Sequence, residues 1–138
     1  MSIIKFEELK IGQKKFITKK ISQENISNFT TLITKQAPHS TEASASFVND
    51  RIPQSSLIGS ILSVLVGSEL PGKGYISINY EIFFPESNLT LEEGDIVKAE
   101  SEIVKKTEDG LVKVKLTCLN QNNELVGWGT SLVKKLSF

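Results

Sequence analysis

The hydrophobic pattern of the chain centres on residues 51–68, where a polar start with one proline leads into an almost unbroken apolar run. Leucine, isoleucine and valine occupy most sides of this segment, and a helix that is apolar nearly all round packs inside a protein. The run is shorter than the ~20 residues that a membrane span requires. We therefore expect one buried central helix that begins near Pro53, is capped by Ser55 or Ser56, and ends after Gly67.

The segments before this helix show weaker patterns. Residues 15–18 have the composition of a short strand. A helix opening at Ser22 is predicted because apolar residues recur at 26, 29 and 33, which places them on one face. Residues 34–41 contain a proline and small polar residues, which indicates a loop, and a short helix over 42–48 is expected to follow.

Alternating apolar and polar residues after the central helix predict four strands, at 75–84, 96–105, 111–119 and 125–133. No helical pattern separates the last three, so a parallel βαβ arrangement is excluded and an antiparallel meander is expected. The sequence thus predicts an α+β fold in one domain, 1–138, with a curved antiparallel sheet wrapped around the central helix.

Composition and charge narrow the classes of function. Lysine plus arginine and aspartate plus glutamate both number 16, so no charge excess favours nucleic acid or an anionic membrane. One cysteine, Cys118, and one histidine, His39, exclude an intrachain disulfide and a Cys/His zinc site within the chain. The first residues do not resemble a secretory signal peptide. We expect a cytoplasmic protein that binds no metal, cofactor, nucleic acid or membrane.

Three segments resemble the MaoC-like (R)-specific enoyl-CoA hydratases and dehydratases. Residues 21–29 are similar to the first helix of that family, and 51–57 to the segment that opens its central helix. Phe84-Pro85, followed by Gly94-Asp95, is similar to its strand and turn. The resemblance implies the hotdog fold, a homodimer, and an acyl-CoA or acyl-carrier-protein thioester as the partner molecule.

The family's catalytic pair is an aspartate, which activates water for addition to C3 of an enoyl thioester, and a histidine five residues later. The resemblance places His39 on that histidine and Thr34 on the aspartate. A second register, which matches Pro38, places Lys35 and Ser40 there instead. The carboxylate is absent in both registers, and threonine cannot take a proton from water near pH 7.

The family's central helix holds the thioester oxygen with backbone N–H groups at its first turn, where the helix dipole favours negative charge. By resemblance, Gln54, Ser55, Ser56 and Ser60 are the candidate substrate-binding residues. Gln54-Ser55 replaces the family's His-Gly pair, and Ser55 can still donate a backbone N–H.

These observations leave three functions open. The first is a hydratase or dehydratase of enoyl-CoA or enoyl-carrier thioesters with an altered base. The second is a catalytically degenerate hotdog protein that binds acyl thioesters or serves as a partner subunit, and the third is an acyl-CoA thioesterase.

Several other residues could contribute to such a site. Glu42 could supply a substitute carboxylate, and Glu69 an acid on the central helix. Lysines on two strands could meet CoA phosphates, at Lys105, Lys113 and Lys115. Cys118 is expected to be a buried structural thiol, and Trp128 to lie in the core or at a dimer interface.

Overall fold

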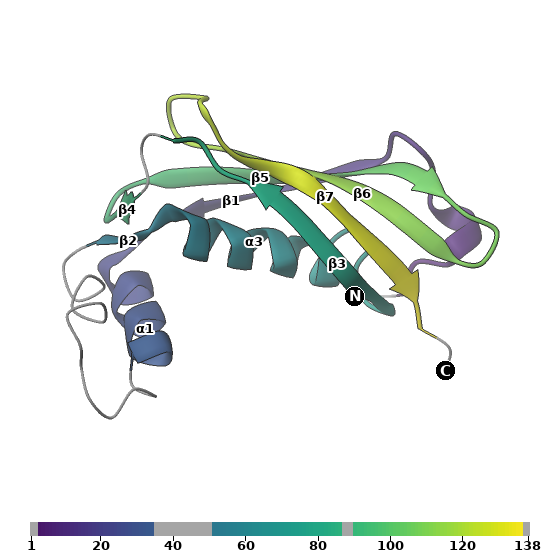
Figure 1. Ribbon diagram of the computed structural model, residues 1–138, viewed down its shortest axis with the longest axis horizontal. Coiled ribbons are helices and arrows are strands. Elements are labelled where there is room, and N and C mark those ends of the chain that lie inside the picture. Colours follow the sequence, from purple (N-terminus) through teal and green to yellow (C-terminus); the bar gives the residue numbers. More distant parts are fainter. Residues whose placement is uncertain (1–2, 35–50, 87–89, 137–138) are drawn as a thin grey trace.

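The computed structural model of the protein describes residues 3–34, 51–86 and 90–136. A curved antiparallel sheet wraps around one long helix, and a second helix stands beside the start of that long helix (Figure 1). In chain order the elements are the 3-10 helix Phe6–Glu8, β1 (Lys14–Lys20), α1 (Gln23–Thr34), β2 (Arg51–Pro53), α3 (Gln54–Ser68), β3 (Tyr75–Phe83), β4 (Thr90–Glu92), β5 (Ile96–Lys106), β6 (Leu111–Leu119) and β7 (Leu125–Lys135).

The main sheet has five strands in the order β1-β5-β6-β7-β3, and every neighbouring pair is antiparallel. Strands β5, β6 and β7 form the predicted meander, and the turn between the first two uses Gly110 at φ +83°. The four long strands begin and end within two residues of their predicted bounds. The predicted α+β class and the antiparallel sheet around a central helix are therefore confirmed.

The start of the central helix differs from the prediction. Arg51–Pro53 is not helical but forms strand β2, which pairs antiparallel with β4, and α3 begins only at Gln54. Ser55 and Ser56 therefore lie inside the first helical turn and do not cap it. The partner strand β4 lies almost 40 residues away in sequence, so a local pattern could not reveal the pairing.

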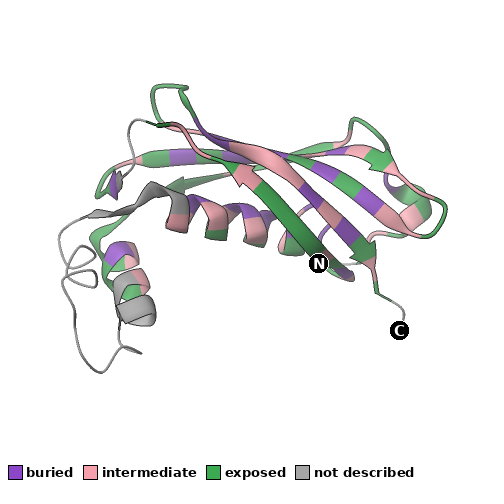
Figure 2. Cartoon of the chain, viewed as in Figure 1, coloured by how far each residue is buried: buried purple, intermediate pink, exposed green. Residues whose placement is uncertain are grey.

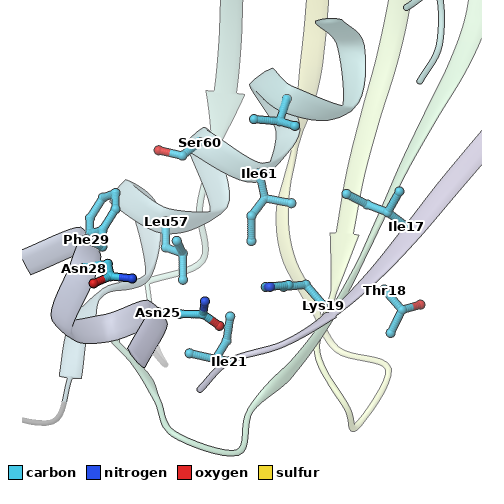
Figure 3. A pocket seen from close by; sticks show the side chains of 11 residues that line it. Ile17, Thr18, Lys19, Ile21, Asn25, Asn28, Phe29, Leu57, Ser60 and Ile61 are labelled. Atoms are coloured by element: carbon cyan, nitrogen blue, oxygen red, sulfur yellow. The ribbon is translucent and has the colours of Figure 1, made fainter. Parts of the chain in front are cut away.

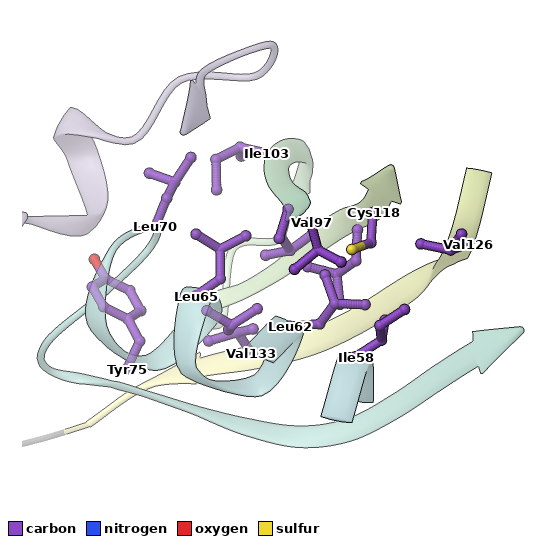
Figure 4. Packing of buried hydrophobic residues seen from close by; sticks show 14 of the residues in the cluster. Ile58, Leu62, Leu65, Leu70, Tyr75, Val97, Ile103, Cys118, Val126 and Val133 are labelled. Atoms are coloured by element: carbon purple, nitrogen blue, oxygen red, sulfur yellow. The ribbon is translucent and has the colours of Figure 1, made fainter. Parts of the chain in front are cut away.

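The core lies between α3 and the inner face of the sheet (Figure 4). Ile58, Leu62 and Leu65 of α3 are fully buried there. They pack in one cluster with buried residues of three strands, namely Val97, Ala99, Ile103, Val112, Val114, Leu116, Cys118, Val126 and Val133. Among the residues that the structure describes, no helix is long and apolar enough to cross a membrane.

The opposite side of α3 faces out of the protomer, so the prediction of a helix buried on all sides is wrong. Val64 is 60% exposed, and Ser60 is also exposed. The hydroxyl groups of Ser60 and Ser63 donate to the carbonyl oxygens of Ser56 and Gly59, each at 2.9 Å. This serine-bearing side therefore satisfies its own hydrogen bonds and leaves its surface available for other contacts.

Trp128 does not lie in the core. It is half-buried and stacks on the exposed Phe83 ring, with 6.3 Å between the ring centroids. Trp128 alternates with Gly127, which is buried, so it lies on the outer face of β7.

Cys118 is fully buried on the inner face of β6, as predicted. Burial raises the pKa of its thiol from 9.0 to about 12. As the pH rises, the thiol ionises in the unfolded chain before it ionises in the folded protein. The contribution of the buried thiol to the free energy of unfolding is therefore complete below pH 9. It falls by a few kcal/mol at most as the pH rises toward 12. We expect a thiol reagent at pH 8 to modify Cys118 only in denaturant, and rapid modification of the native protein would contradict this burial.

Candidate functional site

A pocket of about 460 Å³ opens between α1, β1 and α3 (Figure 3). This volume falls in the ~300–1,000 Å³ range of small-molecule sites. Its walls are mostly apolar, and a few polar groups lie among them. The lining residues are Ile17, Thr18, Lys19, Ile21, Asn25, Asn28, Phe29, Leu57, Ser60, Ile61 and Val64.

Strand pairing explains why β1 lines one wall. Ile17 and Lys19 pair with Ala99 and Val97 of β5, which are fully buried against α3. Directly opposite residues of an antiparallel pair share a face of the sheet, so Ile17 and Lys19 also face the helix side. β1 is one of the two edge strands, and on it Ile17 is only half-buried and Lys19 is exposed, so the inner face of β1 remains accessible.

Helical spacing explains the opposite wall. Leu57, Ile61 and Val64 follow one another at intervals of four and three, which places them on one side of α3. The end of the pocket is closed by α1, which contributes Asn25, Asn28 and Phe29. Leu57 lies in the first turn of α3, so the pocket begins beside the free backbone N–H groups of that helix.

The start of α1 orients one of the polar groups. Ser22 Oγ accepts the N–H of Asn25, while Asn25 Oδ1 accepts the N–H of Ser22, both at 3.0 Å. This reciprocal cap fixes the Asn25 oxygen toward Ser22. The amide nitrogen is therefore available to the pocket, and in Figure 3 it points toward α3.

The chemistry that this lining supports is binding rather than proton removal. Lys19, Asn25 and Asn28 can donate hydrogen bonds, and the apolar walls can hold a hydrocarbon group. Among the described lining residues there is no carboxylate and no imidazole, the groups that most often act as general bases. An imidazole or carboxylate base must therefore come from residues beyond this described lining.

The predicted substrate-binding residues are only partly described. Ser60 lines the pocket, and Ser56 lies one turn earlier, where its carbonyl accepts the Ser60 hydroxyl. Gln54 and Ser55 are the first two residues of α3, which places their backbone at the positive end of the helix dipole. Their side chains lie outside the described part of the structure.

The predicted catalytic residues remain predictions. Thr34 is the last residue of α1, and its side chain lies outside the described part of the structure. His39 lies outside the described residues altogether. The same holds for Lys35 and Ser40 of the second register and for Glu42, the proposed substitute carboxylate.

The other sequence candidates lie away from the pocket. Glu69 follows the last residue of α3, at the far end from Leu57, and its Oε2 lies 3.6 Å from Lys15 Nζ. Lys113 and Lys115 alternate with the fully buried residues of β6, so they lie on the outer face of the sheet. Lys105 pairs with Lys113 and is exposed on the same face, opposite the pocket.

Sequence reasoning did not identify Lys19 as a pocket residue. Its one local signal is a charge between two isoleucines, Ile17 and Ile21, at the alternating spacing of a strand. The spacing alone does not show which face of the sheet Lys19 occupies. The pairing of Lys19 with Val97 of β5 shows that it is the inner face.

Comparison with known proteins supports the predicted resemblance. No protein-family profile matches the sequence. The chain is 28% identical to an (R)-specific enoyl-CoA hydratase of Aeromonas caviae, an alignment covering 93% of this chain and 96% of that protein. It is 26% identical to a 3-hydroxybutyryl-CoA dehydratase of Methylorubrum extorquens, covering 97% and 85%.

A solved structure confirms the fold. The unliganded R-hydratase from Pseudomonas aeruginosa superposes with a TM-score of 0.76 at 22% identity, over 96% of this chain and 86% of that one. The chain therefore has the hotdog fold, and its similarity to (R)-specific enoyl-CoA hydratases and dehydratases, predicted from three segments, extends over nearly its whole length.

Proposed function

We propose that this hotdog chain, as a relative of the (R)-specific enoyl-CoA hydratases and dehydratases, adds water to enoyl thioesters or removes it from 3-hydroxyacyl thioesters. The observation that carries the proposal is the apolar pocket beside the first turn of α3. That arrangement offers a hydrocarbon site next to backbone N–H groups, which are the two features that an acyl thioester requires.

The helix would bind the thioester group. Backbone N–H groups at the start of an α-helix have no partner within the helix and carry part of the positive end of its dipole. In the proposed pose the thioester oxygen accepts from the N–H groups of Ser55 or Ser56. Polarisation of that carbonyl draws electrons from the C2–C3 double bond and makes C3 susceptible to water.

The acyl group would extend from there across the pocket, past Leu57 and Ile61 of α3 toward Lys19 of β1 and Asn25 of α1. Ser60 lies beside this path, where its oxygen can accept a hydrogen bond while its O–H group donates to the Ser56 carbonyl oxygen. These contacts would hold the enoyl group in place without taking part in the reaction.

Proton transfer is assigned to residues outside the pocket lining. Water adds its oxygen to C3, one proton of that water is removed, and C2 gains a proton. We assign both proton movements to His39 and the orientation of the water to the hydroxyl group of Thr34. An imidazole can serve both steps near neutral pH, whereas a threonine can only hydrogen-bond.

A second candidate is a degenerate protein that binds acyl thioesters, or pairs with an active relative, without turnover. The absence of a carboxylate from the described lining favours it. Thioesterase activity has less support, since Gln54 at the start of α3 offers an amide where an acid would be needed. The carrier of the acyl group, CoA or carrier protein, stays open between these candidates.

One experiment separates the three functions on a single purified sample. Crotonyl-CoA is added, and the loss of enoyl absorbance, the release of free CoA thiol and the binding of the thioester are all followed. Enoyl loss without thiol release supports hydration, and thiol release supports a thioesterase. Binding with neither signal supports the degenerate protein and contradicts our proposal.

We also propose that two protomers pair through β3. The sheet has two edge strands, and β1 carries four lysines that discourage pairing, at 14, 15, 19 and 20. Strand β3 carries one charged residue, Glu81, and four exposed large hydrophobic residues, Ile76, Ile78, Tyr80 and Phe83. Figure 2 shows most of β3 exposed along its length. An apolar edge of this kind needs a partner.

Matched substitutions on the two edges test this pairing. Ile78→Lys on β3 should weaken the dimer about 100-fold or more, because two symmetric lysines would repel each other while apolar contact is lost. Phe16→Lys on β1, which replaces a similarly exposed residue, should leave it intact. Analytical ultracentrifugation measures both. A wild-type monomer, or dissociation by Phe16→Lys alone, would contradict pairing through β3.

A further inference from the structure

We propose that the pocket accepts an acyl group that ends in a carboxylate, and that Lys19 and Asn25 hold this carboxylate. The inference rests on the proposed function, because it takes the acyl group of the thioester as the occupant of the pocket. It goes beyond that function by naming the class of substrate, the thioesters of dicarboxylic acids.

The position of Lys19 is the first observation. Its partner across the strand pair, Val97, is fully buried against α3, so the register directs Lys19 to the inner face of the sheet. In Figure 3 its side chain extends from β1 toward α3, between Ile61 and Ile21. A lysine that extends over an apolar surface favours a ligand whose apolar part covers that surface and whose anionic group reaches the ammonium group.

Two other lysines of β1 lie beside carboxylates, whereas Lys19 does not in the part of the chain that the structure describes. Lys14 lies 4.0 Å from a Glu102 oxygen and Lys15 lies 3.6 Å from a Glu69 oxygen. No ion pair joins Lys19 to another residue in the described ranges 3–34, 51–86 and 90–136, and no acidic residue lines the described pocket. The charge of Lys19 is therefore available to a bound anion.

Asn25 supplies the second donor. Because its oxygen is occupied by the N–H of Ser22, the amide group presents N–H donors to the pocket. An ammonium group and an amide N–H group together match the acceptor oxygens of a carboxylate. A methyl-ended acyl chain would leave both donors to water, so only a carboxylate end group would gain these two contacts with the lining.

The test compares trans-2-hexenoyl-CoA with the thioester in which its terminal methyl group is replaced by a carboxylate. Hydration gives kcat/KM for each, and calorimetry with the matched saturated thioesters gives dissociation constants without requiring turnover. Wild type, Lys19→Met and Lys20→Met are measured in parallel. Lys20 is the matched control, since it is an exposed lysine on the same strand that does not line the pocket.

We expect wild type to prefer the carboxylate-ended thioester about 3- to 5-fold, as a charge pair with an exposed lysine would give. Lys19→Met should remove the preference, while Lys20→Met should keep it. Equal binding of both thioesters to wild type would overturn the inference and leave the proposed hydration intact. Equal weakening of both by Lys19→Met would place Lys19 against the CoA moiety and would overturn it too.

The two proposals can fail separately. A carboxylate preference in calorimetry that Lys19→Met abolishes, with no hydration of either enoyl thioester, would support the substrate class while contradicting the hydratase. Hydration of both thioesters at equal kcat/KM, with equal binding, would support the hydratase and contradict the proposed substrate class.

Discussion

Replacing His39 with alanine is expected to lower kcat/KM for crotonyl-CoA hydration by at least about 100-fold, the lower end of what a general acid–base group contributes. The effect should be this large because the described pocket lining offers no other imidazole or carboxylate to take over proton transfer. Binding of the saturated butyryl thioester, measured by calorimetry, should change little, since the acyl contacts come from α1, β1 and α3.

Ser40→Ala is the matched control, because the second sequence register places Ser40 at the histidine position. Activity that survives in Ser40→Ala and disappears in His39→Ala supports the first register. Full activity in the His39→Ala variant would remove His39 from the mechanism. Loss of activity in Ser40→Ala alone would transfer the role to the second register.

Gly129→Ala is expected to lower the free energy of unfolding by about 3 kcal/mol or more, and the melting temperature by about 10 °C. Gly129 lies on β7 opposite Ile82 of β3. A Cβ atom at this position would overlap the Glu81 carbonyl oxygen and lie 2.8 Å from the Ile82 Cα. These are backbone atoms, so the strands themselves would have to separate.

Gly67→Ala provides the comparison for this substitution. Gly67 is exposed in α3, and an added Cβ atom there meets nothing within 4 Å in the described structure. Alanine should therefore stabilise the helix by about 0.5–1 kcal/mol. Urea unfolding measures both variants. A free energy of unfolding for Gly129→Ala within about 1 kcal/mol of wild type would contradict the close approach of β7 and β3.

Local patterns in the sequence were sufficient for most of the fold. Alternation located the four long strands because apolar residues dominate their buried positions, as in β6, where Val112, Val114 and Leu116 are fully buried. The central helix was recognised from its apolar composition. Its beginning was misplaced because the pairing of Arg51–Pro53 with Thr90–Glu92 depends on a contact that is distant in sequence.

The candidate site was harder to predict, for two physical reasons. Ser60 was found because the resemblance places it on the central helix, whereas Lys19 reaches the pocket through the register of an edge strand. Val64 was expected to be buried because it is apolar, yet 60% of it is exposed at the pocket. Apolar character shows that a residue needs a partner, but it does not show whether that partner is the core, a ligand or a second protomer.

The most direct test of the central claim is to incubate the purified chain with crotonyl-CoA and identify the product. We predict 3-hydroxybutyryl-CoA, formed with the thioester intact and only with protein whose His39 is present. Crotonyl-CoA that binds and is recovered unchanged, or that is cleaved to free CoA, would contradict the account.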